Sequence, residues 1–395
     1  MISSAAPATL AHPFVEAIEL PVSPLVASLI AAAIVAALAY RWPAATRRAE
    51  PASGPFASWE GPLGPGRTAA RIAAIGLAVL AVVAGRMGPD SELRNLAPAL
   101  LVGAGWPLLV LASAVAGPVW RWLDPWDGVA RALAPGAPAT APSGVHPAAV
   151  PAAAWAWYLV AFRDSLRPGT VALVFGAYSI ATIIGALATG RGRWLGACEP
   201  IGLVFSWIAR LPRRALTGWT PPPGAELVLG VLAGGLVLGL FRDSSLAPPA
   251  VGGSLAVVAA SAAGGALVVL AGRIGARRGA AGSVAAGMVP ALAGVAVALA
   301  LARNRLLVSV QLLPGLASDP LGRGWDLFGT ADWSIEPSPL GVAGRAAVQV
   351  AVLLAGHVAG AVVVARRTVD VRARDAGAVA LTVSAGLSVA AVTAV

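Results

Sequence analysis

Residues 318–330 read SDPLGRGWDLFGT and bring several charged side chains together in an otherwise apolar chain. Carboxylates such as Asp319 and Asp326 can take a proton from water or bind a hard cation. The glycines between and after them allow positive φ angles and close approach of the backbone. Two interpretations stay open. The segment forms one wall of a working site, or it is a tight interfacial turn before the next helix.

Other polar residues are expected on the same face and would complete such a site. The tetrapeptide FRDS occurs at 162–165 and again at 241–244, each time at the end of an apolar stretch. A divalent metal ion would make a nucleophile of a bound water by lowering its pKa. The candidates are His12, Asp243 and Asp319 as metal ligands, Asp319, Asp326 and Asp243 as catalytic carboxylates, and Gln311, Asn304, Trp325 and Asp164 as pocket residues. The alternative is a solvated outer face on which the aspartates cap helices or pair with neighbouring arginines.

The remaining histidines and the single cysteine limit the chemistry. His357 lies in LLAGHVAGAV, inside an apolar stretch, and an ionisable group within a membrane is a functional candidate. The alternative is a neutral imidazole that bonds to a neighbouring helix across a small-residue packing surface. With three histidines and one cysteine, Cys198, one chain can form neither an internal disulfide nor a metal site of several histidines and cysteines.

The chain that positions these residues is too apolar for a water-soluble domain. Of its 395 residues, 58% are hydrophobic and 12% are charged, whereas soluble domains carry about 25% charged residues. A membrane-spanning helix needs about 20 apolar residues. Apolar stretches near this length lie at 20–40, 72–85, 95–120, 147–162, 168–190, 227–241, 244–272, 279–302, 346–365 and 376–395. The sequence therefore predicts an all-α polytopic integral membrane protein of about ten transmembrane helices.

The distribution of arginine predicts the orientation. The net charge of +10 would suit a nucleic-acid partner, but arginine collected at the ends of spans is what membrane topology requires. Placing the N-terminus outside puts most arginines in the inner loops and leaves the C-terminus outside as well. We therefore expect a multi-pass protein of the cell membrane that has the lipid bilayer as its partner and binds no nucleic acid.

Four further segments complete the expected organisation. Residues 1–19 form a short outer segment before a single transmembrane helical domain over 20–395. The stretch near 200–210 is too short to cross and predicts an interfacial helix on the inner surface. Residues 131–149 form a Pro/Ala-rich inner loop and 304–340 an outer loop. Within the outer loop, 306–318 extends the eighth helix or lies along the outer interface.

Several blocks together resemble a known family. LAHPFVEAIELPV (10–22), GPVWRWLDPWDG (117–128) and GRWLGACEPIGLVFSWIARLP (192–212) precede SDPLGRGWDLFGT and QVAVLLAGHVAG (349–360) in the same order. In these blocks the chain resembles the bacterial integral membrane family named fenitrothion hydrolase. The resemblance implies a polytopic membrane protein that hydrolyses organophosphorus triesters, and it carries over no catalytic residue.

Two hypotheses about function follow. The first is an integral membrane hydrolase of organophosphorus triesters at the outer polar site. The second is a transporter or permease, or the membrane subunit of a complex with a second membrane protein, that handles a metal cation. An enzyme needs the outer carboxylates to converge on one pocket, whereas a transporter needs a polar path that continues inward towards His357.

Overall fold

The computed structural model describes residues 23–41, 64–134, 143–212, 215–242, 244–245, 253–368 and 371–394. These residues form helices and turns, and no strand occurs among them. The helices are α1 (Pro24–Arg41), α2 (Pro65–Met87), η1 (Pro98–Gly105), α3 (Trp106–Ala116), α4 (Trp120–Leu123), α5 (Pro125–Leu133), η2 (His146–Ala148), α6 (Ala149–Val160), α7 (Pro168–Thr189), α8 (Arg191–Ala197), α9 (Pro200–Ile208), α10 (Ala225–Phe241), α11 (Ser254–Arg277), α12 (Ser283–Leu301), η3 (Ala302–Asn304), α13 (Arg305–Ser318), α14 (Gly341–Arg367) and α15 (Val371–Thr393).

The predicted fold class is confirmed. Eight helical segments of the described chain are long and apolar enough to cross a membrane. Each of the ten apolar stretches of the sequence contains a helix. Two of these helices, α6 with 12 residues and α10 with 17, are shorter than the eight that can cross a membrane. The stretch at 72–85, in contrast, belongs to a helix of 23 residues. The chain is an all-α, multi-pass membrane protein.

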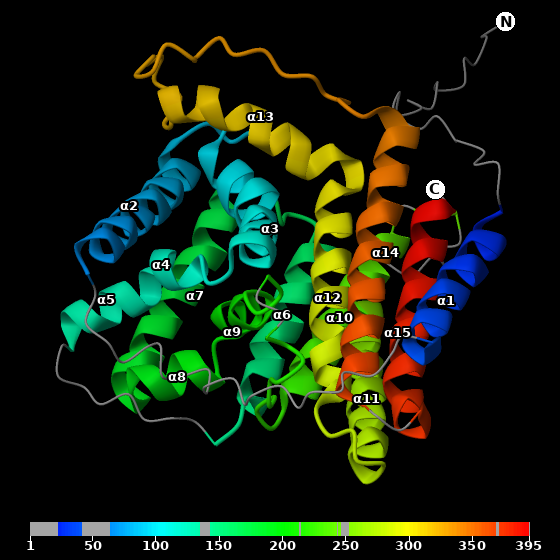
Figure 1. The fold of residues 1–395 in the computed structure, drawn as a ribbon. Coiled ribbons are helices and arrows are strands. Elements are labelled where there is room, and N and C mark those ends of the chain that lie inside the picture. Colours follow the sequence, from blue (N-terminus) through cyan, green and yellow to red (C-terminus); the bar gives the residue numbers. More distant parts are fainter. Residues whose placement is uncertain are drawn as a thin grey trace, which may run out of the picture.

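Two groups of helices share one core (Figure 1). On one side, α1, α10, α11, α12, α14 and α15 form a tight bundle with α12 buried at its centre. Glycines allow its backbones to approach closely, because a Cβ at Gly264 on α11 would lie 2.3 Å from the carbonyl oxygen of Gly230 on α10. On the other side lie α2, η1, α3, α4, α5, α7 and α8, with α6 and α9 between the two groups.

The sharp turn after α12 decides where the next helix runs. Arg303 and Asn304 both have a φ of 56°, in the left-handed region, so the chain changes direction there. α13 consequently does not extend α12 but lies across the end of the molecule, over η1 (Figure 1). Of the two alternatives for 306–318, extension of the eighth helix is therefore wrong, and part of the predicted outer loop 304–340 is helical. That the segment lies along the outer interface stays a prediction.

The helix expected near 200–210 is present as α9, but its surroundings differ from the prediction. Its side chains, including Leu203, Phe205 and Trp207, are buried against α3, α4, α6, α8 and α12. We expected an amphipathic helix on the inner membrane surface. The nine residues between Glu199 and Ala209, nonpolar except for Ser206, instead pack into protein, because a helix with so little polar surface is stabilised by burial.

The two ends of the described chain lie at the same end of the molecule. The Arg374 guanidinium, near the start of α15, donates to the carbonyl oxygens of Ala39 and Tyr40 at the end of α1. The two helices are therefore antiparallel, and the start of α1 lies beside the end of α15 (Figure 1). That this end faces outside stays a prediction. Residues 1–19, and 135–142 of the predicted inner loop, lie outside the described residues.

Candidate functional site

The segment SDPLGRGWDLFGT is a folded loop whose polar side chains bind its own backbone. The Asp319 carboxylate accepts hydrogen bonds from the backbone N–H groups of Arg323 and Gly324, at 2.8 and 2.7 Å. The hydroxyl of the buried Ser318 accepts from the N–H of Phe328 at 3.0 Å. Asp326 accepts from the N–H of Ala331, and this bond is the main cause of the lowered pKa of Asp326. These bonds support the interpretation of the segment as a tight turn.

Asn304 and Gln311 fasten the following chain to α13. The Asn304 amide donates to the carbonyl oxygen of Pro337 and to the Ser338 hydroxyl. The Gln311 amide donates to the carbonyl oxygen of Glu336, and its own oxygen accepts from the N–H of the same residue at 2.7 Å. The amide groups of both side chains thus hold the loop, while the Asn304 side-chain oxygen is buried with no hydrogen-bond partner among the described residues.

The remaining outer candidates do not converge among the residues the structure describes. Trp325 is 45% exposed on the loop, and Asp164 is exposed in the turn between α6 and α7. His12 and Asp243 lie outside the described residues. Within the described ranges, no group of three or more His, Cys, Asp or Glu side chains is placed to hold a metal ion. Of the predicted ligands these ranges contain Asp319, whose two carboxylate oxygens already accept backbone hydrogen bonds.

His357 sits in the bundle, apart from these residues. It is fully buried, and its ring nitrogens pair with the Leu353 carbonyl oxygen at 2.8 Å and the Ser384 hydroxyl at 2.9 Å. Both partners belong to α14 and α15, so the imidazole links two helices. This arrangement fits the structural alternative for His357.

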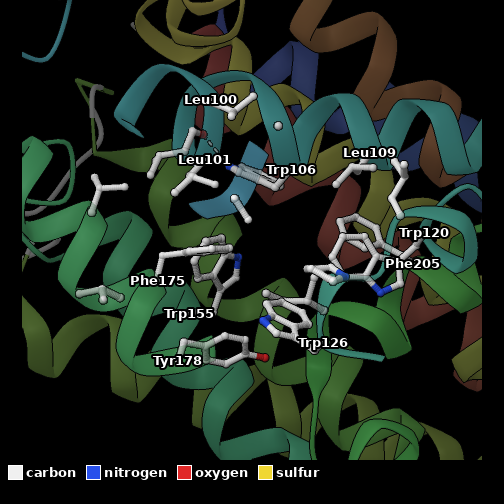
Figure 2. A pocket seen from close by; sticks show the side chains of 18 of the residues that line it. Leu100, Leu101, Trp106, Leu109, Trp120, Trp126, Trp155, Phe175, Tyr178 and Phe205 are labelled. Atoms are coloured by element: carbon white, nitrogen blue, oxygen red, sulfur yellow. Dashed lines mark hydrogen bonds between the residues drawn. The ribbon is translucent and has the colours of Figure 1, made fainter. Parts of the chain in front are cut away.

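A cavity of about 370 Å³ lies in the other half of the molecule, and sequence reasoning did not single it out. It is enclosed by α2, η1, α3, α4, α5, α6, α7 and α9 (Figure 2). Its lining is almost wholly apolar. The aromatic members are Trp106, Trp120, Trp126, Trp155, Tyr158, Phe175, Tyr178 and Phe205. A cavity of this size and character is typical of a small-molecule site.

Five of the eight aromatic side chains, Trp120, Trp126, Phe175, Tyr178 and Phe205, form one connected wall. The Trp120 ring lies 5.2 Å from Phe205 and 5.5 Å from Trp126, and Trp126 meets the edge of Tyr178 at 5.2 Å, centroid to centroid. The indole N–H of Trp126 donates to the Ser179 hydroxyl at 3.0 Å, which fixes the orientation of that ring. Aromatic pairs at these distances stabilise each other beyond the area that they bury.

The roof of the cavity is a π-helix. Leu100, Leu101 and Val102 of η1 line it, and the Trp106 indole N–H donates to the carbonyl oxygen of Val102 at 2.8 Å. Two observations explain why so loosely wound a segment stays ordered. α13 packs over η1, and the approach is so close that a Cβ at Gly103 would lie 1.9 Å from the Ser309 hydroxyl. π-Helical segments are rare and are frequent at functional sites.

The floor of the cavity is built from two helix starts, each capped by a buried carboxyl group. Asp124 precedes Pro125 and accepts from the N–H groups of Trp126 and Asp127, both at 3.0 Å. Glu199 precedes Pro200 and accepts from the N–H groups of Ile201 and Gly202, at 2.7 and 2.6 Å. In each case the proline after the acid lines the cavity. An acid at the N-cap followed by proline is a favoured helix start.

Glu199 reaches the cavity through Tyr178. The Tyr178 hydroxyl, on the cavity wall, donates a short hydrogen bond to the Glu199 carboxylate. The other carboxylate oxygen and the indole nitrogen of Trp120 both lie close to Gly202. A Cβ added to Gly202 would lie 2.8 Å from Glu199 Oε2 and 3.1 Å from Trp120 Nε1. That N–H is buried and has no hydrogen-bond partner in the described structure. The floor therefore joins an acid, a phenol and an unpaired donor.

Burial changes the ionisation of both capping acids. Burial raises the pKa of Glu199 to about 7, although Tyr178 and the two backbone N–H groups oppose the shift. Burial also raises the pKa of Asp124, to about 8, with the neighbouring charges of Asp127 and Glu199 acting in the same direction. A carboxyl group with a pKa near 7 can both take up and release a proton at neutral pH.

Asp127 behaves differently, because arginines surround it. Its carboxylate, fully buried, forms ion pairs with Arg71, with Arg131 at 3.0 Å and with Arg191 at 2.6 Å. These pairs join α2, α5 and α8 and hold the floor of the cavity in place. Asp127 is thus the structural acid of this region, whereas Asp124 and Glu199 cap the two helices whose first prolines line the cavity.

The sequence contained one signal for this site. Asp124-Pro125 and Glu199-Pro200 are acid-proline pairs, and each lies in a tryptophan-containing block, WRWLDPWDG or GRWLGACEPIG. In the sequence alone, a solvated loop carboxylate is the simplest interpretation of both acids. The folding of α5 and α9 back into the protein removes them from water, and no pattern in either short segment predicts this.

Comparison with protein-family models, with curated proteins and with solved structures gives no match. The class of protein therefore rests on the fold itself, which is that of a helical membrane protein with an apolar cavity. The resemblance to the fenitrothion hydrolase family stays a prediction.

Proposed function

We propose that this chain is a cell-membrane protein that binds a neutral, apolar small molecule in the aromatic cavity. The observation that carries the proposal is the cavity lining, in which eight aromatic side chains surround about 370 Å³. Figure 2 places the indole nitrogen of Trp155 towards the centre of these residues, where it can donate to an oxygen of the ligand. A compact aromatic ester with one exposed acceptor oxygen fits both features.

Binding is tested with a neutral nitroaryl phosphotriester, because a nitroaryl group quenches tryptophan fluorescence on contact. We expect saturable quenching in the wild type and none in Leu101→Trp, which fills the cavity. Trp155→Phe keeps the ring but removes the donor, so affinity should fall about three- to tenfold, the effect of one neutral hydrogen bond. Trp333→Phe, on the exposed loop, is the matched control. Equal quenching in wild type and Leu101→Trp would refute binding in the cavity.

A second candidate is hydrolysis of an organophosphorus triester, the activity that the resemblance implies. The supporting observation is that Glu199, with a pKa of about 7, stands behind Tyr178 at the cavity floor. In that reaction water attacks phosphorus, one of its protons passes to the Glu199 carboxylate, and the bond to the aryl oxygen breaks with its electron pair. The products are an aryl oxide and a diester, which becomes an anion when it loses the second proton of the attacking water to solvent. This route uses Glu199 behind the cavity wall and not the outer candidates.

Release of nitrophenolate tests that step. Glu199→Gln should leave quenching by the triester within about twofold of wild type and reduce the rate of release at least a hundredfold, as expected for loss of a general base. An unchanged rate in Glu199→Gln would remove Glu199 from the reaction. A wild type that binds without releasing nitrophenolate would leave binding as the function and favour the transporter or membrane-subunit alternative.

A further inference from the structure

Several arginines gather around one buried carboxylate beneath the cavity. Asp127 is the carboxylate that pairs with Arg71, Arg131 and Arg191, and two of these arginines are more than nine-tenths buried. Arg71 also donates to the main-chain carbonyl oxygen of Arg121 at 3.0 Å, which places Arg121 directly beside this cluster. Asp124 and Glu199 are raised in pKa and contribute less than full negative charges near neutral pH.

Arg121, like Arg67, forms no ion pair among the described residues. The Arg121 guanidinium is half-buried, and its Nε is shielded from water with no hydrogen-bond partner. Burial lowers the pKa of Arg121, and the positive charges of Arg67, Arg71 and Arg131 lower it further, while the Asp127 carboxylate acts in the opposite direction. Arg67 is held near it, with its guanidinium 5.8 Å from the ring centroid of Trp122. A shielded guanidinium among other cations calls for a negative partner.

The position of this cluster indicates which anion fits. Arg67 lies in the first turn of α2, a helix long enough to cross the membrane. Arg121 lies in α4, the short helix that follows α3. Trp122, between them, is 47% exposed, as tryptophan is at the level of lipid headgroups. A planar guanidinium matches the oxygens of a phosphate, and a phospholipid supplies a phosphate at this depth.

We propose that Arg121 and Arg67, with Trp122 between them, bind the phosphate of an anionic phospholipid. The site is separate from the cavity, and it does not depend on what the cavity holds. It would tie the α2, α4 and α5 region to the bilayer surface and give the Arg121 and Arg67 guanidinium groups an anionic partner.

The test is a lipid titration of the purified full-length protein in detergent, followed by native mass spectrometry. Phosphatidylglycerol should bind the wild type with at least one tight site, and phosphatidylcholine should not. Arg121→Gln and Arg67→Gln should each weaken the tight site about fivefold, the contribution of one basic residue near a charged headgroup. Arg121→Lys keeps the charge and should recover part of the affinity, which separates loss of binding from misfolding. Arg277→Gln, an exposed arginine at the end of α11, is the control and should bind as the wild type does.

Two results would overturn the proposal. If Arg121→Gln and Arg67→Gln bind phosphatidylglycerol as tightly as Arg277→Gln, the lipid does not occupy this cluster. If inorganic phosphate alone competes with the lipid at equal concentration, and soluble phosphate stabilises the wild type as well as the lipid does, the site takes a free phosphate ion rather than a headgroup.

Discussion

Among single residues, Asp127 has the largest expected effect on stability, because three arginines depend on one buried carboxylate. Asp127→Asn keeps the shape of the side chain but leaves these charges unpaired. We expect a loss of about 3–5 kcal/mol in the free energy of unfolding, the usual effect of breaking a buried pair. Unfolding in mixed micelles by a denaturing detergent measures it. Asp375→Asn, which removes a half-exposed pair with Arg278, is the control and should cost less than about 1 kcal/mol. Equal losses would mean that the Asp127 network is not buried.

The raised pKa of Glu199 gives a pH dependence of known sign. Folded protein keeps the Glu199 proton up to a pH of about 7, whereas the unfolded chain releases it near its usual value of 4.5. The folded state therefore binds more protons in this window, and the free energy of unfolding falls as pH rises through it, by about 3 kcal/mol in all. In Glu199→Gln the melting temperature should fall less with rising pH than in the wild type. The decrease that remains should come from Asp124 and continue to about pH 8. Asp326→Asn should act in the acid range with the opposite sign, because the pKa of Asp326 is lowered. If the melting temperature of the wild type rose from pH 5 to pH 7 and that of Glu199→Gln did not, the raised pKa of Glu199 would be contradicted.

The metal site at His12, Asp243 and Asp319 stays a prediction that metal analysis can test. Protein purified without chelator should contain a stoichiometric divalent metal ion if these residues bind one. The ion should then be lost in His12→Ala and in Asp319→Asn but kept in Asp326→Asn. A metal content that is the same in all three variants would place the ion elsewhere. Asp319→Asn should in addition loosen the loop, because it weakens the bonds to Arg323 and Gly324.

Residue types alone indicated the outer loop, and they could not indicate the cavity. Asp319 and Asp326 stand out because they are charged in an apolar chain, but their hydrogen bonds serve the loop backbone. Asp124 and Glu199 look like ordinary loop acids in the sequence. Their altered ionisation depends on burial by helices distant in the chain, and that information is absent from the local pattern.

At the scale of helices, close packing between α10 and α11 depends on glycine. A Cβ at Gly264 would meet the Gly230 carbonyl oxygen at 2.3 Å, and this atom belongs to the backbone and cannot move aside. Gly264→Ala should therefore destabilise the protein by about 1–3 kcal/mol, as overpacking does. Gly76→Ala on α2 meets nothing within 4 Å and should be neutral or stabilise by up to about 1 kcal/mol, because alanine favours helix. Similar losses at both positions would show that general helix effects, and not the contact, account for the change.

The long helices were predictable and the short ones were not. Apolar length fixes elements such as α7 and α14, because a lipid-facing backbone must satisfy its own hydrogen bonds. Short segments such as α5 and α9 carry no such constraint, and their place in the fold is set by what they pack against. The turn at Arg303 and Asn304 was equally hidden, because residues other than glycine seldom adopt positive φ angles.

The orientation of the whole molecule is the remaining prediction, and it rests on arginine distribution rather than on packing. With Cys198 replaced by alanine, Asp332→Cys should react with a membrane-impermeant maleimide in intact cells, because Asp332 lies on the exposed loop after α13. Arg277→Cys, at the C-terminal end of α11, should react after the membrane is permeabilised and not before. The reverse pattern would invert the topology and place the tight loop inside, with the Arg121 cluster on the outer surface. Labelling of both positions in intact cells would contradict a single orientation and would argue that the protein inserts both ways.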